Sequence, residues 1–361
     1  MLSIGRVASE PPLDLTGQIR RLHKDNVFAG GFGDIHKCLY HRPSGTIEVA
    51  VKTLRFWAMS EQGKSTHDVV EKYLRRELGI WRRLDHPNIV PLLGTVSGFG
   101  PHISLVSLWM PNGTLQAFLA AHDDKLAIGH RFHLLKDVAA GLQYLHECSV
   151  IHGDLTGRNV LIDERFRARL VDFGYSTAIG DLPDSLAYLH WTSQQPGSIR
   201  WTAPEKVRQQ QSDDNVEPAG NSDIYSFGCI MLQVLSGNIP WSEIKADMTV
   251  VLRLANGENP QRPMSRRIDD EHWAVIQKCW LPVGDRFSAE QVLGELDSIL
   301  TSLPSSSSFG KSITLPIAPS QTRQDRGVTR LTADVFEPFT PESSSAKQKS
   351  VKTGHKTSAS S

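Results

Sequence analysis

The chain lacks the features that mark disulfide-bonded, secreted or membrane-spanning proteins. Its four cysteines are far apart and form no C-x-x-C pair, so we expect reduced thiols rather than disulfides or a zinc site. No stretch approaches the ~20 consecutive apolar residues of a membrane-spanning helix. The first residues contain no apolar run typical of a signal peptide. We therefore expect an intracellular protein, cytoplasmic with the nucleus as an alternative, without membrane insertion.

Net charge is also absent, because 39 basic and 39 acidic residues give a formal charge of zero. The balance hides a modest asymmetry: residues 301–361 carry a net charge of +4 and the remainder carries −4. This split is too small for a dedicated nucleic-acid-binding protein, so no nucleic-acid partner is expected. With 361 residues, 39% of them hydrophobic, the chain is long enough to bury a real core.

Three segments differ in their residue pattern. Residues 1–18 show little periodicity and are expected to form a flexible N-terminal segment. The domain expected over 19–303 begins strand-rich with one helix, over about 19–108, and continues mostly helical, over about 113–303. This order indicates an α+β fold with two lobes around a cleft. Residues 304–361 are rich in Ser, Thr and Lys and poor in large apolar residues, which predicts a disordered tail.

A glycine-rich segment joins two predicted strands near the N-terminus. Glycines allow a hairpin backbone to approach phosphate oxygens and to turn its N–H groups toward them. An ordinary glycine-rich hairpin has the same pattern, so the segment alone does not decide between the two. Its residues are Gly30, Gly31, Phe32 and Gly33, with Ile35 following.

Lys52 directly follows a short apolar run, in the sequence Val-Ala-Val-Lys. Because an unpaired buried charge is costly, this lysine needs an acidic partner. The amphipathic helix predicted over about 66–83 supplies Glu77, which borders the apolar stripe of the helix. Taken alone, Glu77 would be a surface charge beside Arg75 and Arg76, and only the other motifs favour the ion pair.

A polar loop separates an apolar helix from an apolar strand at residues 152–159, His-Gly-Asp-Leu-Thr-Gly-Arg-Asn. Asp154 and Asn159 place a carboxylate and an amide in this loop, which is where catalytic groups are expected. Asp172 follows within Asp-Phe-Gly at the end of a short apolar strand. An ordinary strand-end turn is the alternative for Asp172, and its separation of 18 residues from Asp154 argues against that alternative.

In this order the motifs resemble the protein kinase superfamily, over about residues 19–300. The resemblance implies the bilobal protein-kinase fold, with a small β-rich lobe and a larger helical lobe. It also implies phosphoryl transfer from Mg·ATP to protein substrates. The His-Gly-Asp loop is similar to that of aminoglycoside phosphotransferases as well. The Ala-Pro-Glu motif at 203–205 and Arg286 argue against such a small-molecule kinase.

The resemblance assigns a role to each motif. Asp154 is the expected catalytic base, Lys52 contacts the α- and β-phosphates while Glu77 holds it, and Asn159 and Asp172 bind Mg²⁺. A small gatekeeper at Ser107 implies an open pocket behind the adenine ring. The nucleotide-binding residues implied by the resemblance are Gly30, Gly31, Phe32, Gly33, Ile35, Ala50, Lys52, Ser107, Leu108, Met110 and Leu161.

Further residues are implied to support the site. Asp223 is expected to bond the backbone of the catalytic loop from a buried helix, and Arg286 to form a buried ion pair with Glu205. The hydrophobic stack that aligns active kinases would consist of Trp81, His152 and Phe173.

At five positions the sequence departs from the motifs of serine/threonine kinases, of tyrosine kinases or of both. Phe28 replaces the first glycine of the phosphate loop. Gly153 replaces an arginine that pairs with an activation-loop phosphate, so activity is not expected to depend on that pairing. Thr156 replaces the lysine of serine/threonine kinases, and Arg158, at a tyrosine-kinase position, is expected to supply the positive charge near the γ-phosphate. Ser198 stands where tyrosine kinases carry proline, lines the substrate pocket and favours Ser/Thr acceptors.

This combination of serine/threonine-kinase and tyrosine-kinase features resembles the tyrosine-kinase-like group. Within that group it resembles fungal serine/threonine kinases that carry Gly-Asp in this loop. We therefore expect a serine/threonine protein kinase with signalling partners that the sequence does not identify. Two alternatives stay open. The departures at Phe28 and Gly153 are compatible with a pseudokinase or scaffold that binds nucleotide with little catalysis. Arg158 is compatible with a dual-specificity or tyrosine kinase.

Overall fold

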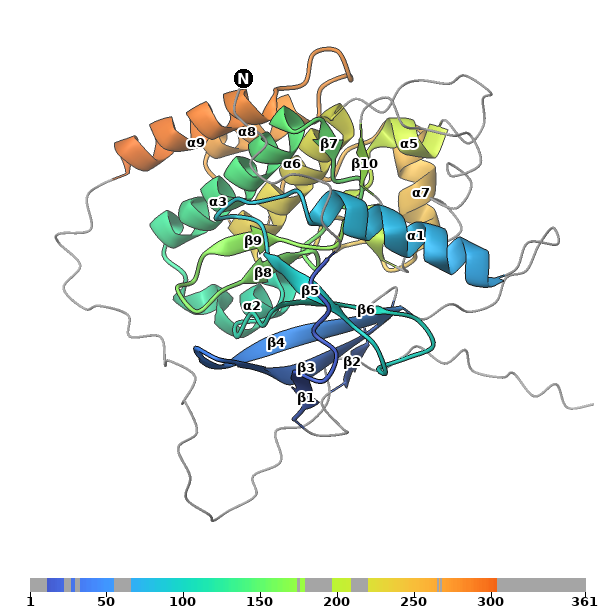
Figure 1. Cartoon of the computed structure of the whole chain (residues 1–361). Helices are drawn as coiled ribbons and strands as arrows, with labels where there is room; N and C mark the ends of the chain where they lie inside the picture. The colour runs from blue at the N-terminus through green and yellow to red at the C-terminus, as the bar shows by residue number, and fades with distance from the viewer. Residues whose placement is uncertain are drawn as a thin grey trace, which may run out of the picture. The chain divides into compact units, whose positions relative to one another are not determined.

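The computed structural model describes residues 12–22, 27–29, 33–54, 66–173, 176–178, 197–208, 220–264, 266 and 268–303. Its N-terminal part is a twisted sheet with one helix, and its C-terminal part is mainly helical (Figure 1). The predicted α+β fold with two lobes is confirmed. The predicted tail over 304–361 lies outside the described residues.

One antiparallel sheet forms the first lobe. Its strands are β1 (Ile19–Arg21), β2 (Val27–Ala29), β3 (Gly33–Arg42), β4 (Gly45–Leu54), β5 (Leu92–Val96) and β6 (Ser104–Leu108). The order is β1-β3-β4-β6-β5, and β2 pairs with β3. Side chains alternate between the two faces of a strand. Val51 therefore packs into a small core with Val49 and Val106, and its neighbour Lys52 is directed to the opposite face.

Residues 12–18 are part of this lobe, which corrects the expectation of a flexible segment over residues 1–18 for its described part. Within the described part of that segment, Leu15 is fully buried in the core of the sheet. Its N–H donates to Thr95 O at 2.8 Å, and Thr95 N–H donates to Leu13 O at 2.9 Å. A Cβ atom at Gly94 would lie 2.2 Å from Leu13 O, so this close approach requires glycine. The domain therefore begins before residue 19.

The helix α1 (Thr66–Trp81) joins the first lobe to the second. Leu74 and Trp81 are buried in the large core, which also contains residues of the helical lobe. Trp81 Nε1 donates to Val90 O at 2.6 Å, which satisfies its buried polar atom. The face of α1 between these two residues carries Glu77.

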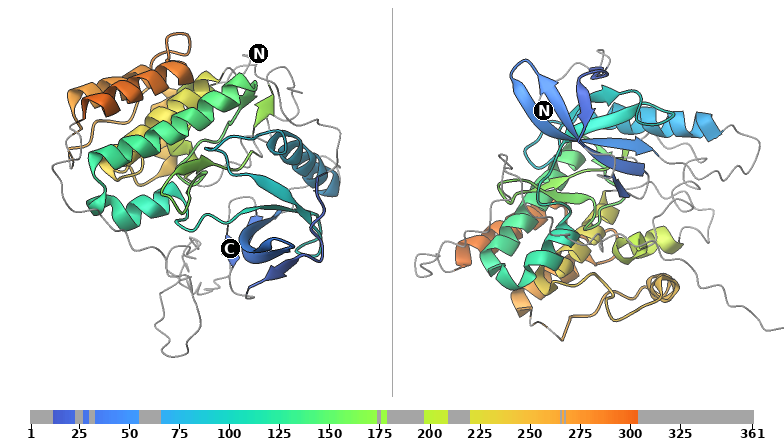
Figure 2. Two further views of the ribbon diagram at one scale, coloured as in Figure 1. Left: turned by 60° about the vertical axis from the view of Figure 1, so that its left-hand side comes forward. Right: turned by 90° about the horizontal axis from the view of Figure 1, so that it is seen from below.

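Helices gather on the side of the second lobe away from the sheet (Figure 2). Every residue of α6 (Asn221–Ser236) from Ser222 onward is buried, so this helix lies at the centre of the lobe. The long helix α3 (Ile128–Glu147) packs against both α6 and α9. The remaining helical elements are α2 (Leu115–His122), η1 (Asp123–Lys125), η3 (Ser198–Trp201), α5 (Pro204–Arg208), α7 (Asp247–Ala255), α8 (Asp270–Cys279) and α9 (Ala289–Ser302).

Short strands carry the polar loops of this lobe. The strands are β7 (Val150–Ile151), β8 (Val160–Ile162), β9 (Ala168–Leu170) and β10 (Thr177–Ala178). Antiparallel pairing joins β8 to β9 and β7 to β10. The loop 152–159 therefore lies between two fixed strands, and residues 171–173 leave β9 beside it. Leu170 N–H and O both bond the backbone near Ile89, which ties β9 to the chain after α1.

A nearly buried arginine anchors α5. Arg286 is 3% exposed at its side chain, and its two terminal nitrogens donate to Glu205 Oε1 at 2.5 Å and Glu205 Oε2 at 2.8 Å. Arg286 also donates to Asn221 O at 3.0 Å and to Leu281 O at 2.8 Å. One guanidinium therefore holds three segments of the lobe together.

Arg286→Ala is expected to lower the free energy of unfolding by about 3–5 kcal/mol, because it leaves the Glu205 carboxylate without its partner. Urea denaturation followed by tryptophan fluorescence measures the change. The control is Arg253→Ala, which breaks the half-exposed pair with Glu258 and is expected to cost about 0–1 kcal/mol. Equal losses in the two variants would contradict the role given to Arg286.

Candidate active site

The site is built around one buried cation with two acidic partners. Lys52 Nζ on β4 donates to Glu77 Oε1 of α1 and to Asp172 Oδ1 after β9, both at 2.8 Å. Glu77 is fully buried, and the side chains of Lys52 and Asp172 are 11% and 15% exposed. Three elements from both lobes therefore meet at a single ammonium group.

Burial and charge act against each other in this cluster. Burial lowers the pKa of Lys52, but the carboxylates of Asp172 and Glu77 more than offset it, so the pKa is raised above its ordinary value. Burial also raises the pKa of Glu77, and the nearby Lys52 opposes that effect. Because breaking either contact leaves an uncompensated buried charge, the three groups are held as a unit.

Asp223 fixes the backbone that enters the catalytic loop. His152 N–H and Gly153 N–H donate to its two carboxylate oxygens at 2.8 and 2.9 Å, and His146 Nε2 lies 3.1 Å from Oδ2. Burial alone raises the pKa of Asp223, but the bond with His146 and nearby positive charges hold the pKa at about 2. The carboxylate is therefore ionised at neutral pH, when it accepts these bonds.

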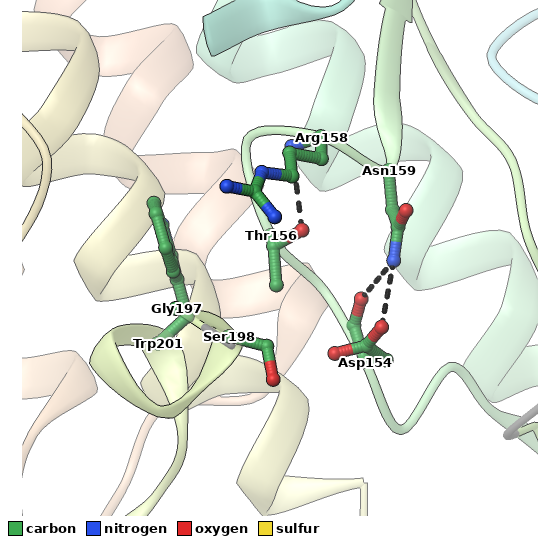
Figure 3. Close-up of a pocket in the computed structure, with 7 residues that line it drawn as sticks. All are labelled: Asp154, Thr156, Arg158, Asn159, Gly197, Ser198 and Trp201. Atoms are coloured by element: carbon green, nitrogen blue, oxygen red, sulfur yellow. Dashed lines mark hydrogen bonds between the residues drawn. The ribbon is translucent and has the colours of Figure 1, made fainter. Parts of the chain in front are cut away.

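Asp154 lies next to Asn159 (Figure 3). Asn159 Nδ2 donates to Asp154 O at 2.8 Å and to Asp154 Oδ2 at 2.9 Å, which orients the carboxylate. Burial and the charge of Asp172 raise the pKa of Asp154 to about 7, against the opposing effects of Asn159, Lys206 and Arg158. A carboxylate with a raised pKa in such a loop is suited to accept a proton.

An aromatic stack links α1 to the catalytic loop. Phe173 lies 5.7 Å from Trp81 and 5.6 Å from His152, measured between ring centroids. All three side chains are buried. The preceding Asp172 has φ of 70°, in the left-handed region that only a few per cent of non-glycine residues adopt. This conformation directs Phe173 into the stack while Asp172 contacts Lys52.

A pocket lies beside Asp154, between the catalytic loop and η3 (Figure 3). Within the described part of the chain, Ser198 Oγ and Trp201 Nε1 are buried and have no hydrogen-bond partner. Thr156 Oγ1 accepts from Arg158 N–H at 3.3 Å, and this hydrogen bond closes a short turn within the loop. Residues around this pocket are Asp154, Thr156, Arg158, Asn159, Gly197, Ser198 and Trp201.

The expected adenine-binding residues lie on adjacent strands. Ala50 of β4 pairs directly with Ser107 of β6, which is buried, and β6 ends at Leu108. Met110 follows, also buried, and Leu161 on β8 is half-buried. Gly33 and Ile35 both lie on β3, where they pair with Leu54 and Lys52. Gly30, Gly31 and Phe32 lie outside the described residues.

The donor set near Asp154 fits a magnesium ion. Asn159 uses its Nδ2 group for Asp154, so its carbonyl oxygen is directed elsewhere, and Asp172 engages Lys52 through Oδ1. Mg²⁺ usually takes one or two protein oxygens together with waters and phosphates. Among the described residues no group of three or more His, Cys, Asp or Glu could hold a metal ion. A cation there would also offset the charge that Asp172 exerts on Asp154.

Two side chains at the site are not identified by the sequence motifs. His146, near the end of α3, bonds Asp223, and Lys206 on α5 donates to Gly153 O at 3.0 Å. Lys206 directly follows the Ala-Pro-Glu motif, but nothing in the sequence indicates which way it points. His146 lies six residues before His152, and its spacing offers no signal beyond that of a helical surface residue.

Comparison with known proteins agrees with this geometry. Residues 23–296 match the protein tyrosine and serine/threonine kinase family. The chain therefore belongs to this family, and membership implies the use of ATP and a divalent metal ion.

The curated relatives include both acceptor classes. The chain is 31% identical to ephrin type-A receptor 3 of Danio rerio over 75% of its own length and 26% of the receptor. It is 33% identical to ephrin type-A receptor 8 of Rattus norvegicus over 68% of this chain and 61% of that protein. It is 30% identical to the serine/threonine-protein kinase CTR1 of Arabidopsis thaliana, over 71% of this chain and 29% of CTR1.

The chain spans about a quarter of the length of the ephrin type-A receptor 3 sequence that it matches. Among the described helices, none has both the length and the apolar character needed to cross a membrane.

Ser107→Phe is expected to weaken binding of an adenine analogue with a bulky N6 substituent about tenfold or more, because overpacking a filled site costs about 1–3 kcal/mol. Wild-type protein is expected to bind the same analogue. Competition against a fluorescent nucleotide gives both affinities, and the affinity for unmodified ATP is the internal control. If the variant binds the analogue as well as the wild type does, Ser107 does not border the adenine site.

In the free protein, Asp154 is expected to titrate at a pKa of about 7. Below that pH the carboxyl group is protonated, and above it the group is ionised and able to accept a proton. Adding Mg²⁺ with a non-hydrolysable ATP analogue is expected to lower the pKa, because a nearby cation favours the charged form. Carbon-13 NMR of the aspartate carboxyl groups measures both values, with Asp154→Asn assigning the signal. An ordinary pKa in the free protein would contradict the described environment.

Proposed function

We propose that this protein is a serine/threonine protein kinase that transfers the γ-phosphate of ATP to hydroxyl groups of protein substrates. The main support is the convergence of Lys52, Glu77 and Asp172 through two 2.8 Å contacts, close to the Asp154–Asn159 pair. Phosphoryl transfer depends on positioning and charge stabilisation, and these groups supply both.

In this proposal the residues of the chain have separate tasks. Asp154 accepts the proton of the acceptor hydroxyl and orients its oxygen, while Asn159 keeps the carboxylate in place. Lys52 binds the α- and β-phosphates and is held by Glu77. Arg158, which lines the pocket beside Asp154, supplies positive charge near the γ-phosphate.

Mg·ATP supplies the phosphoryl group when it is bound. Asp172 and Asn159 would hold the metal ion through their side-chain oxygens. The glycine-rich segment at Gly30, Gly31, Phe32 and Gly33 would bind phosphates, with Ile35 above the adenine ring. Ala50 and Leu161 would enclose the ring, and the backbone of Leu108 and Met110 would bond it beside Ser107.

The proposal of Ser or Thr as the phosphate acceptor is based on Ser198. Ser198 is 8% exposed, and its hydroxyl oxygen is buried and without a partner among the described residues. Ser198 and Asp154 line the same pocket. Unpartnered buried hydroxyls are uncommon, and a hydroxyl at this position beside Asp154 favours a small Ser or Thr acceptor. CTR1 is a serine/threonine kinase by name. The mixed features fit the tyrosine-kinase-like group, including the fungal kinases with Gly-Asp in the loop.

A second candidate is a tyrosine or dual-specificity kinase. Two observations favour it: Arg158 lines the pocket as in tyrosine kinases, and ephrin receptors are among the relatives. The four free cysteines support an intracellular setting.

Asp154→Asn is expected to lower kcat by about 10²–10⁴-fold, the usual contribution of a general base, while nucleotide affinity stays unchanged. The assay follows labelled phosphate from Mg·ATP into a generic basic protein and into the chain itself. Asp124→Asn, at an exposed position in η1, is the matched control and should behave as wild type.

Phospho-amino-acid analysis of the labelled product then separates the two candidates. Phosphoserine or phosphothreonine supports the proposal, and phosphotyrosine alone supports the second candidate. A wild-type protein that binds ATP without transfer would make the chain a pseudokinase and overturn both.

A further inference from the structure

The two peptide groups that flank Gly153 are each held by a charged side chain. On one side, Gly153 N–H donates to Asp223 Oδ1 at 2.9 Å. On the other side, Gly153 O accepts from Lys206 Nζ at 3.0 Å. Asp223 belongs to the central helix α6, and Lys206 belongs to α5, which follows η3. The backbone leading into Asp154 is therefore clamped between opposite charges from two different elements.

Glycine at position 153 makes this stretch of backbone costly to order. Gly153 has φ of 82°, in the left-handed region. Glycine enters this region without strain, but it also loses more conformational freedom on ordering than any other residue. Asn159 restrains the Asp154 carboxylate itself, and fixing both peptide groups of Gly153 restrains the backbone that leads into Asp154. Hydrogen bonds to charged groups are strong enough to fix them.

Lys206 is suited to this task by its surroundings. It is half-buried, and it lines a second pocket together with Asp154, Thr156 and Ser198. No carboxylate lies within ion-pair distance of its ammonium group in the part of the chain that the structure describes. Its neighbour Glu205 instead pairs with Arg286. Because this pair anchors α5, it also fixes the backbone position of Lys206.

We propose that Lys206 is a positioning residue that orients Asp154 by binding the carbonyl oxygen of Gly153. This proposal deepens the proposed kinase function and rests on it. Lys206 supplies a cation to the loop from α5, in a chain where Gly153 and Thr156 carry none. The catalytic loop and α5 are thus connected by a hydrogen bond within the chain. This connection requires no phosphate group on the protein.

The test compares Lys206→Met with Lys206→Arg and with the control Lys125→Met, which changes an exposed lysine of η1. Methionine retains the length of the side chain and removes the donor, whereas arginine retains the charge and the donor. Steady-state kinetics gives kcat and the KM for ATP. Hydrogen exchange of the peptide covering 150–160 reports the order of the loop and needs no activity.

Lys206→Met is expected to lower kcat about tenfold or more, the size expected for one hydrogen bond to a charged group, with little change in the KM for ATP. Exchange in 150–160 should accelerate by a similar factor. Lys206→Arg should recover most of both properties, and Lys125→Met should match wild type. A general loss of folding would instead raise exchange throughout the domain and would not be relieved by arginine.

Unchanged kcat and unchanged exchange in Lys206→Met would overturn the proposal, as would equal defects in the methionine and arginine variants. If the wild type transfers no phosphate, the proposed function fails. Hydrogen exchange then still decides whether Lys206 orders the loop.

Discussion

The burial of one ammonium group between two carboxylates is the constraint on which the rest of the structure depends. Lys52 belongs to the sheet, Glu77 to α1, and Asp172 to the chain after β9. Removing Lys52 would leave two carboxylates without their shared cation, and loss of one partner of a buried pair costs about 3–5 kcal/mol. The two lobes are therefore joined by ion pairs as well as by apolar packing.

The second lobe provides a rigid frame for this junction. The helix α6 is buried on all sides, so Asp223 is fixed and fixes the backbone of the catalytic loop in turn. Phe173 contacts both Trp81 and His152, which joins α1 to the same loop through apolar contacts. Charge and packing thus act on the same few residues, and both orient Asp154 relative to Lys52.

Local patterns predicted the strands, the helices and the polar loops of this arrangement, and the resemblance to kinases predicted which polar groups meet. The apolar run before Lys52 indicates that the lysine needs an acidic partner, and the stripe of the helix places Glu77 at its border. Taken alone, this pattern favours a surface charge at Glu77, and the ion pair was predicted only with the other motifs. The pair of Glu205 and Arg286 came only from resemblance, since 81 residues separate them. The packing of Leu15 was missed because an isolated apolar residue before a strand has no periodic neighbours. The contact of Lys206 with Gly153 depends on how α5 is oriented, which is a tertiary property.

We infer that Lys52, Glu77 and Asp172 act as one unit in catalysis. The most direct measurement is a double-mutant cycle of kcat/KM for phosphate transfer, using Lys52→Met, Glu77→Gln and the double variant. Groups that act as a unit give strongly non-additive losses. We expect the double variant to be hardly worse than Lys52→Met alone. Losses that add in full would show that Lys52 and Glu77 act independently and would contradict their action as one unit.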